Sequence, residues 1–180
     1  ETIYHRQLKM TSPALNRFRD LVLYNLEAGQ AVLTDNNDIR IYTDGKEKFH
    51  ALIEEMKRAK KYIHVQYYII RNDEVWQDIE KVLIEKAHEG VEVRVLFDSM
   101  GCRTMHKRDW DRLKCEGIRV AEFFPAILGQ LQMRVNYRNH RKIVVIDGKV
   151  GFVGGFNVGR EYIGKDEKFG YWRDTHLCIE

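Results

Sequence analysis

The sequence is poor in the residues that build disulfide frameworks, zinc sites and membrane spans. Its 180 residues include only 3 Cys and 2 Pro. The cysteines match no C-x-x-C spacing, so neither a disulfide framework nor a structural zinc site is expected. No apolar run approaches the roughly 18 residues of a membrane span, and no signal-peptide pattern is present. We therefore expect a chain that is soluble by itself and works in reducing surroundings.

Neither sign of charge dominates. Lys and Arg number 30 against 27 Asp and Glu, a net charge of +3, which is too small to indicate nucleic-acid binding but would not repel an anionic surface. At roughly 150 residues per domain, the length predicts one globular unit with a short appendage. The chain starts at Glu1 instead of Met and ends within a strand-like pattern, so we expect a fragment of a larger protein.

The spacing of apolar residues predicts an alternation of helices and strands after a first helix near 13–28. This order predicts an α/β fold, with a mixed, largely parallel sheet flanked by helices on both faces. It also divides the chain into an N-terminal helix and connection, 1–38, and a main domain, 39–180. Strands are expected at 31–33, 39–42, 62–70, 91–97, 118–123, 142–146 and 150–153, and helices near 49–56, 75–90 and 110–113.

The most informative segment runs from Asn139 to Asp147 and is followed by Gly154-Gly155-Phe156-Asn157. On a strand, His140 and Lys142 would share a face and meet one anionic group. The glycine pair would let the backbone approach a ligand, with the Asn157 amide as a donor. Taken one at a time, these features also fit ordinary structure: a buried strand, two turns and a histidine at a strand edge. Together they predict a site of phosphate size, because the compound pattern arises rarely by chance.

This pattern resembles the signature of the phospholipase D superfamily, His-x-Lys-x4-Asp followed by Gly-Gly or Gly-Ser, one residue and Asn. Within it, the chain is similar to the first catalytic half of bacterial cardiolipin synthases, over nearly all residues from 39 to the end. The segments that carry this likeness are 66–69, 97–101, 138–142, 156–162 and 172–176.

The resemblance implies a site built from two such motifs, whereas this chain holds one. Transfer through a covalent intermediate needs one neutral imidazole to attack phosphorus and another, protonated, to release the alkoxide. His140 is expected to be the nucleophile or its acid/base counterpart, with Lys142 and Asn157 stabilising charge. Asp147, also a member of the motif, is expected to fix a turn more than to touch substrate. The partner motif would come from the same chain or from a second subunit.

Asp174 is the candidate acceptor for the other ring nitrogen of His140, as superfamily members place a carboxylate downstream of the motif. An ion pair with Arg173 is the alternative. Candidate substrate-binding residues are Gly154, Gly155, Gln66 and Arg138. Gln66 would share a strand face with His64, which core packing also explains, and scattered solvated arginines are the alternative for Arg138 and its neighbours Arg134, Arg141 and Arg160.

Several other positions fit either a role at the site or ordinary structure. Asp98 and Glu122 fall at strand ends and either contribute to the site or cap turns. His176 alternates with Asp174 and supports the site or simply packs. The apolar stretch 123–131, which includes Ile127 and Leu128, is a membrane-facing loop or ordinary packing under a loop. No metal ligand set is visible, and no cofactor is expected.

The resemblance implies a phosphatidyltransferase that makes cardiolipin and glycerol from two phosphatidylglycerol molecules through a phosphohistidine. Its partners would be anionic phospholipid, a membrane surface and the second half, and its location the bacterial cell membrane with the catalytic domain facing the cytoplasm. The residues alone support phosphodiester transfer. Two alternatives stay open: a single-motif homodimeric phosphodiesterase or nuclease, and a catalytically silent lipid-binding half.

Overall fold

The structure of the protein is a computed structural model that describes residues 13–34, 36–125 and 137–180. The chain divides into two compact units between Asn37 and Asp38. In the first, α2 (Pro13–Asn16) and α3 (Arg19–Gly29) replace the single helix predicted over 13–28. The strand predicted at 31–33 is wrong. Gln30 turns left-handed and Ala31 donates to the Asn25 carbonyl at 3.1 Å, so these residues close α3 instead of forming a hairpin.

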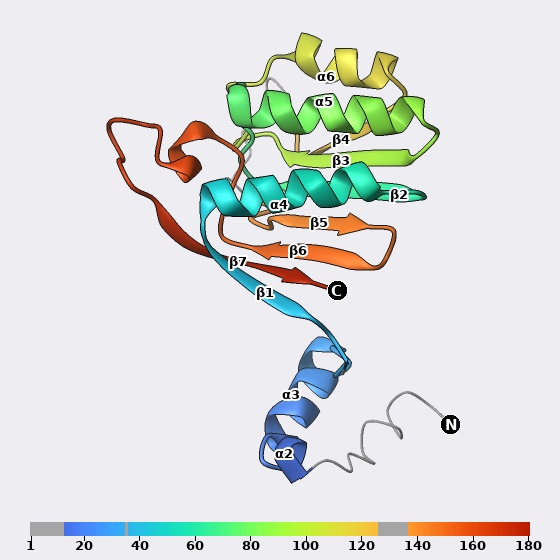
Figure 1. The fold of residues 1–180 in the computed structure, drawn as a ribbon, viewed down its shortest axis with the longest axis vertical. Helices are drawn as coiled ribbons and strands as arrows, with labels where there is room; N and C mark the ends of the chain where they lie inside the picture. Colours follow the sequence, from blue (N-terminus) through green and yellow to red (C-terminus); the bar gives the residue numbers. More distant parts are fainter. Residues whose placement is uncertain (1–12, 35, 126–136) are drawn as a thin grey trace. The chain divides into compact units, whose positions relative to one another are not determined.

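The second unit is built on one seven-stranded sheet (Figure 1). Its order is β1-β7-β6-β5-β2-β3-β4. Because β1 and β7 lie side by side, the start and the end of this unit meet at one edge of the sheet. The strands are β1 (Ile39–Asp44), β2 (Tyr62–Tyr67), β3 (Glu92–Asp98), β4 (Arg119–Phe123), β5 (Ile143–Ile146), β6 (Val150–Gly154) and β7 (Arg173–Ile179).

The α/β class and the mixed sheet are confirmed, but the sheet is not largely parallel. Only β2–β3 and β3–β4 pair in parallel, and the other neighbours pair antiparallel. The reason lies in the connections. Parallel neighbours need a crossover helix, whereas β5 and β6 are joined by a tight turn and β7 returns beside β6 through a loop.

The three long helices, α4 (Gly45–Arg58), α5 (Glu74–His88) and α6 (Lys107–Cys115), lie on one side of the sheet (Figure 1). Each joins two strands of the same direction and steps toward β4, so right-handed crossovers place all three on the same face. The expectation of helices on both faces is therefore wrong for the described residues. On the other face, side chains such as Ile41 and Val153 stay exposed.

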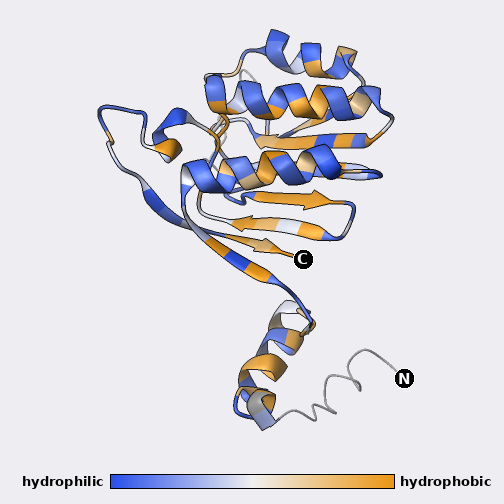
Figure 2. Cartoon of the chain, viewed as in Figure 1, coloured by the Kyte–Doolittle hydropathy of each residue, from blue (hydrophilic) through white to orange (hydrophobic). Residues whose placement is uncertain are grey.

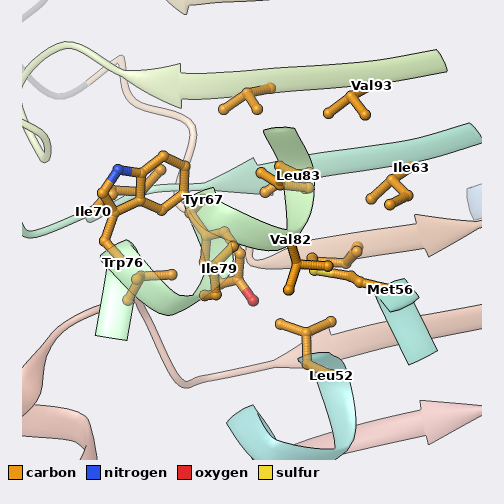
Figure 3. Close-up of a cluster of buried hydrophobic side chains, with 14 of the residues drawn as sticks. Leu52, Met56, Ile63, Tyr67, Ile70, Trp76, Ile79, Val82, Leu83 and Val93 are labelled. Carbon is orange, nitrogen blue, oxygen red and sulfur yellow. The ribbon is translucent and has the colours of Figure 1, made fainter. Parts of the chain in front are cut away.

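The core lies between these helices and the sheet (Figure 3). Alternate residues of β2, Ile63, Val65 and Tyr67, are buried against Leu52 of α4 and Ile79 of α5. Burying one such side chain stabilises the fold by about 1.5–3 kcal/mol. The visible sides of the helices are mainly hydrophilic, while the central strands are mainly hydrophobic (Figure 2).

One edge of the sheet gathers polar residues. Strands β1, β2, β3, β4 and β6 run in one direction and β5 and β7 in the other, so the ends of the former meet the starts of the latter. Asp98 ends β3, Gly154 ends β6, Lys142 directly precedes β5, and Asp174 lies at the start of β7. The fold thus brings together residues that lie far apart in the sequence.

Candidate active site

His140 and Lys142 lie just before β5, not within a strand as predicted. His140 is exposed, whereas Lys142 is 4% exposed and its Nζ donates to the His140 carbonyl at 2.7 Å. The Tyr68 ring connects the two side chains. Its centroid lies 4.7 Å from that of the His140 imidazole and 5.4 Å from Lys142 Nζ. The motif's base and its cation therefore border the same aromatic ring.

Asp98 fixes the chain next to His140. Its Oδ2 accepts from the Asn139 amide at 3.0 Å, and its Oδ1 accepts from the amides of Met100 at 2.9 Å and Gly101 at 3.2 Å. The side chain is almost fully buried. Asp98 thus caps its own turn, as one alternative predicted, and also holds the backbone beside His140.

The electrostatics of the site favour a neutral imidazole next to a cation. Burial, and then the Lys142 charge, lower the pKa of His140 below its usual value, while Asp98 raises it. Burial lowers the pKa of Lys142 to about 8, and Asp174 opposes this shift. At pH 7 the imidazole is thus mainly unprotonated and the lysine mainly charged, which suits a nucleophile beside an anion-binding group.

Asn157 is buried and its amide is oriented from both ends. Its Oδ1 accepts from the Ile69 amide at 3.0 Å, and its Nδ2 donates to the Tyr162 hydroxyl at 3.1 Å. Because an amide nitrogen carries two hydrogens, one N–H remains beyond the bond to Tyr162. The side chain is therefore held in one orientation, and one N–H of its amide remains for a further hydrogen bond.

Gly154 and Gly155 make room for β7. A Cβ at Gly155 would lie 1.9 Å from Asp174 Oδ1, and one at Gly154 would lie 2.4 Å from the Cα of His176. Their amides already donate, Gly154 to the Lys142 carbonyl at 3.3 Å and Gly155 to the Thr175 carbonyl at 2.8 Å. The glycine pair thus lets Asp174 approach the motif.

Asp174 acts on the lysine of the motif. It raises the pKa of Lys142, whereas the acid that raises the pKa of His140 is Asp98. Asp174 Oδ1 also accepts from the Thr175 amide at 2.7 Å. The structure therefore places Asp174 against Gly155, where its charge acts on Lys142. Acceptance from the second ring nitrogen of His140 stays a prediction.

Asp147 lies at the opposite end of β5 from the rest of the motif. Its Oδ1 accepts from the amides of Lys61 and Tyr62 at 2.8 and 2.9 Å, and its Oδ2 accepts from the Lys60 amide at 2.8 Å. These bonds lower its pKa, although burial alone would raise it. A catalytic role does not fit this position, and the carboxylate instead ties the turn after β5 to the start of β2.

Gln66 is not brought to the site. It pairs with Ile143 across β2 and β5 and lines the uncovered sheet face together with His64. Strand alternation explains this, because Val65 and Tyr67 take the helix-covered face. The prediction that Gln66 binds substrate beside His140 is therefore wrong.

Arg138 lies at the mouth of the site. It lines a hollow together with His140, Phe123 and Tyr137, and its Cζ lies 5.3 Å from the Phe124 ring centroid. Phe123, Phe124 and Tyr137 form an aromatic group with centroids 5.5–6.4 Å apart. The proposed membrane-facing residues Ile127 and Leu128, like Arg134, lie outside the described residues.

Sequence reasoning assigned no role to Tyr68, Tyr162 and Lys48. Both tyrosines lie in segments that carry the family likeness, but each also fits core packing, and Lys48 lies on an amphipathic helix. Lys48 is fully buried, donates to the Tyr67 hydroxyl at 2.8 Å, and has its pKa lowered well below the usual value by burial. His176 is also fully buried, and burial followed by the charges of Lys48 and Lys142 lowers its pKa to about 3.

Three further expectations concern metal ions, Glu122 and membrane spans. Within residues 13–34, 36–125 and 137–180, no three His, Cys, Asp or Glu side chains are grouped so that they could hold a metal ion. Glu122 is exposed and lines a separate hollow with Trp110 and Lys114. Over the same described ranges, no helix is long and apolar enough to cross a bilayer.

Comparison with known proteins agrees with this geometry. The chain is 49% identical over 173 residues to a cardiolipin synthase of Oceanobacillus iheyensis, covering 96% of this chain and 36% of the relative. It is 52% identical over 163 residues to a cardiolipin synthase of Staphylococcus aureus strain Mu50, covering 91% of this chain and 33% of the relative. The chain thus spans about a third of the length of these curated relatives.

Solved structures share the fold at low sequence identity. Nuc from Salmonella typhimurium, a phospholipase D family member, superposes with a TM-score of 0.57 at 16% identity, over 80% of this chain and 83% of that one. At this identity the likeness concerns the fold alone. Residues 52–169, which include His140, Lys142 and Asn157, match the family described as the cardiolipin synthase, PLD-like domain. This chain belongs to that family of phospholipase D-like domains.

Proposed function

We propose that this chain supplies one half of a phosphatidyltransferase site that makes cardiolipin and glycerol from two phosphatidylglycerol molecules. The observation that carries the proposal is an exposed imidazole whose pKa is lowered, next to a buried lysine that donates to the carbonyl of the same histidine. The Asn157 amide of the same motif is held in one orientation. The substrate is inferred from the curated relatives, which are named cardiolipin synthases.

The reaction would take place in two displacements at phosphorus. A ring nitrogen of His140 attacks the phosphodiester of the first phosphatidylglycerol, the bond to the terminal glycerol oxygen breaks, and glycerol leaves with a proton from the histidine of the second motif. That histidine then takes the proton from a hydroxyl of the second phosphatidylglycerol. The resulting alkoxide attacks phosphorus, the phosphorus–nitrogen bond breaks, and cardiolipin is released.

The other residues of the site would stabilise and position. Lys142 Nζ and the remaining Nδ2 hydrogen of Asn157 would stabilise charge on the non-bridging oxygens. Asp174 keeps the lysine charged by raising its pKa. Arg138, at the mouth of the same hollow as His140, would attract the anionic headgroup. Asp98 would keep His140 in place through the Asn139 amide.

The partners follow from the same chemistry. One imidazole cannot be the nucleophile and the leaving-group acid in the same displacement, so a second His-x-Lys-x4-Asp motif is required, in the same chain or in another subunit. Both proposed substrates are anionic bilayer lipids, so the reaction would take place at the surface of a bacterial cell membrane. The resemblance to cardiolipin synthases implies that the catalytic domain faces the cytoplasm.

The test uses a chimera in which this chain replaces the matching third of the Oceanobacillus iheyensis cardiolipin synthase. With radiolabelled phosphatidylglycerol vesicles and excess chelator, we expect equimolar glycerol and cardiolipin, and an acid-labile, alkali-stable phosphoenzyme mapped to His140. His88→Ala, which alters an exposed histidine on α5, is the matched control. Normal product formation by the His140→Ala chimera would overturn the proposal.

The 180-residue chain alone separates the alternatives. Chelator-resistant glycerol release by this chain would mean that two copies complete a site. Cleavage of DNA in preference to lipid, by the chain or the chimera, would favour the nuclease. Vesicle binding by the chimera without turnover would favour the silent half and overturn the transferase.

A further inference from the structure

The loop between the short helix η1 (Arg160–Ile163) and β7 exposes two large aromatic side chains. Phe169 is 53% exposed and Tyr171 is 72% exposed. These two lie two residues apart on a loop, 164–172, that projects from the sheet (Figure 1). Single exposed apolar residues are common, but two large rings on one projecting loop indicate a contact surface.

The loop belongs to the edge of the sheet that carries the active site. It is part of the connection from Asn157 to Asp174, two residues that the fold places at that edge. The loop therefore returns to the sheet at the start of β7, next to Asp174. A surface that contacts this loop would lie on the side of the domain that carries this edge.

Aromatic packing braces the loop from inside. The Trp172 ring lies 5.7 Å from Phe169 and 5.1 Å from Tyr162, both edge to face. Tyr162 is buried and its hydroxyl accepts from Asn157 Nδ2. A continuous row of contacts thus runs from exposed Phe169 to the oriented amide of the site. Such bracing lowers the entropy lost when the exposed rings bind.

The charges of the loop balance, and one lysine lies directly beside an exposed ring. Loop 164–172 contains Lys165 and Lys168 against Asp166 and Glu167. Lys165 lies 3.6 Å from Glu74, so Lys168 is the loop cation that an anionic headgroup would meet first. The Lys168 ammonium lies 5.5 Å from the Phe169 ring centroid. Aromatic rings beside lysines are typical of segments that lie at the interface of anionic bilayers.

We propose that loop 164–172 is the element through which this domain contacts an anionic phospholipid bilayer. Phe169 and Tyr171 enter the boundary between headgroups and acyl chains, and the neighbouring cations meet the headgroups. The choice of phospholipid as the surface rests on the proposed function. The loop then holds the edge with His140 against the layer that contains both substrates.

Vesicle binding of the 180-residue chain tests the loop directly. The measurement is co-sedimentation with equimolar phosphatidylglycerol–phosphatidylcholine vesicles. We expect the double variant Phe169→Ser, Tyr171→Ser to lower the partition coefficient at least about tenfold, because each ring transfers apolar area out of water. Ile41→Thr, at a 66% exposed apolar residue of β1, is the control and should change binding less than about twofold. Double-variant binding within twofold of the wild type would overturn the proposal.

Trp172 provides a second readout that needs no destabilising change. Trp76 and Trp110 are buried in the core, so Trp172 is the tryptophan near the surface. Lipids brominated on the acyl chains should quench part of the fluorescence in vesicles, and Trp172→Phe should abolish that part. An absence of quenching while the chain is vesicle-bound would place the contact elsewhere and overturn the proposal.

Neither measurement depends on turnover. A wrong reaction with a correct loop would give normal loop-dependent binding and no product from the chimera. A correct reaction with a wrong loop would give product and loop-independent binding. If the double variant loses self-association in the ultracentrifuge and keeps vesicle binding, the loop contacts a second copy of the chain, and the bilayer proposal fails.

Discussion

The two ends of strand β5 differ in how fully their polar side chains are used by the fold. At the far end, both Asp147 carboxylate oxygens accept backbone amides from 60–62. At the near end, His140 is exposed, with its imidazole beside Tyr68. One sequence motif therefore contains a carboxylate that is fully used by the fold and an exposed imidazole, about one strand length apart.

Membership of a motif therefore does not define a residue's role. A carboxylate whose oxygens are occupied by protein amides contributes to stability, while an imidazole with an accessible ring and a lowered pKa remains available for chemistry. Changes at the near end should therefore affect rate, and changes at the far end should affect unfolding.

The largest expected effect is on rate at the near end. His140→Ala in the chimera should lower the rate of cardiolipin formation by at least about a thousandfold, because the nucleophile is removed. The free energy of unfolding should change little, since the side chain is exposed. Product assays and urea denaturation check both halves. A decrease in rate of less than tenfold would contradict the proposed difference between the two ends of β5.

Next comes stability at the far end. Asp147→Asn should lower the free energy of unfolding by about 1–3 kcal/mol, because the carboxylate's charged hydrogen bonds to the amides are weakened. The rate per folded molecule should stay within about twofold of the wild type. Urea denaturation is the measurement, with Asp111→Asn at an exposed helical site as the control.

This stability difference should depend on pH. The folded-state pKa of Asp147 is lowered, so its contribution is fully present above the unfolded value near 4 and is lost as pH falls through the folded value. The gap between the wild type and Asp147→Asn should thus narrow in acid. A gap that widened as pH fell would contradict the clamp.

A smaller effect concerns the pH dependence of the rate. The lowered pKa of His140 keeps the imidazole neutral down to more acidic pH. Protonation of His140 should therefore limit the rate only at pH values below the usual pKa of histidine. Lys142, with a pKa of about 8, should produce a fall in rate as the pH rises through that value and its charge is lost. In Lys142→Arg the guanidinium stays charged, so this alkaline fall should vanish from the kcat/KM profile. An unmoved fall would assign it to another group.

The smallest effect is expected at Gly155. An added methyl would displace the Asp174 carboxylate, which raises the pKa of Lys142, so Gly155→Ala should move the alkaline fall to lower pH by less than about one unit. Gly151→Ala, on β6 with open space at its Cβ position, is the control and should leave the profile unchanged. The kcat/KM profiles of the two variants make the comparison.

Much of the fold could be predicted from local patterns. The helix spacing around Leu52 and Ile79 and the apolar runs of β2 and β3 are local signals, and they gave the right element types. Strand direction could not be read in the same way. Whether β5 pairs with β2 in parallel or antiparallel depends on how a long connection returns, which no local period encodes.

The site divides along the same line. The spacing of His140, Lys142 and Asn157 indicated it, and the family resemblance suggested Asp174, whose bond to His140 stays a prediction. Gln66 was misplaced because strand alternation decides which face a side chain takes, but not which face the helices cover. Tyr68 and Tyr162 were given no role, although they lie in segments that carry the family likeness, because each looks like an ordinary core aromatic until the sheet brings it to His140 or Asn157.

Short-range spacing and residue type were enough to predict the α/β class and the family motif, because both are encoded locally. Only the folded chain shows which amides Asp147 binds, that Asp98 holds the chain beside His140, and that the α-helices of the second unit lie on one side of the sheet. The bonds of Asp147 and Asp98 join residues 87 and 41 positions apart. Such contacts form when strands take their order in the sheet, so only the folded chain shows them.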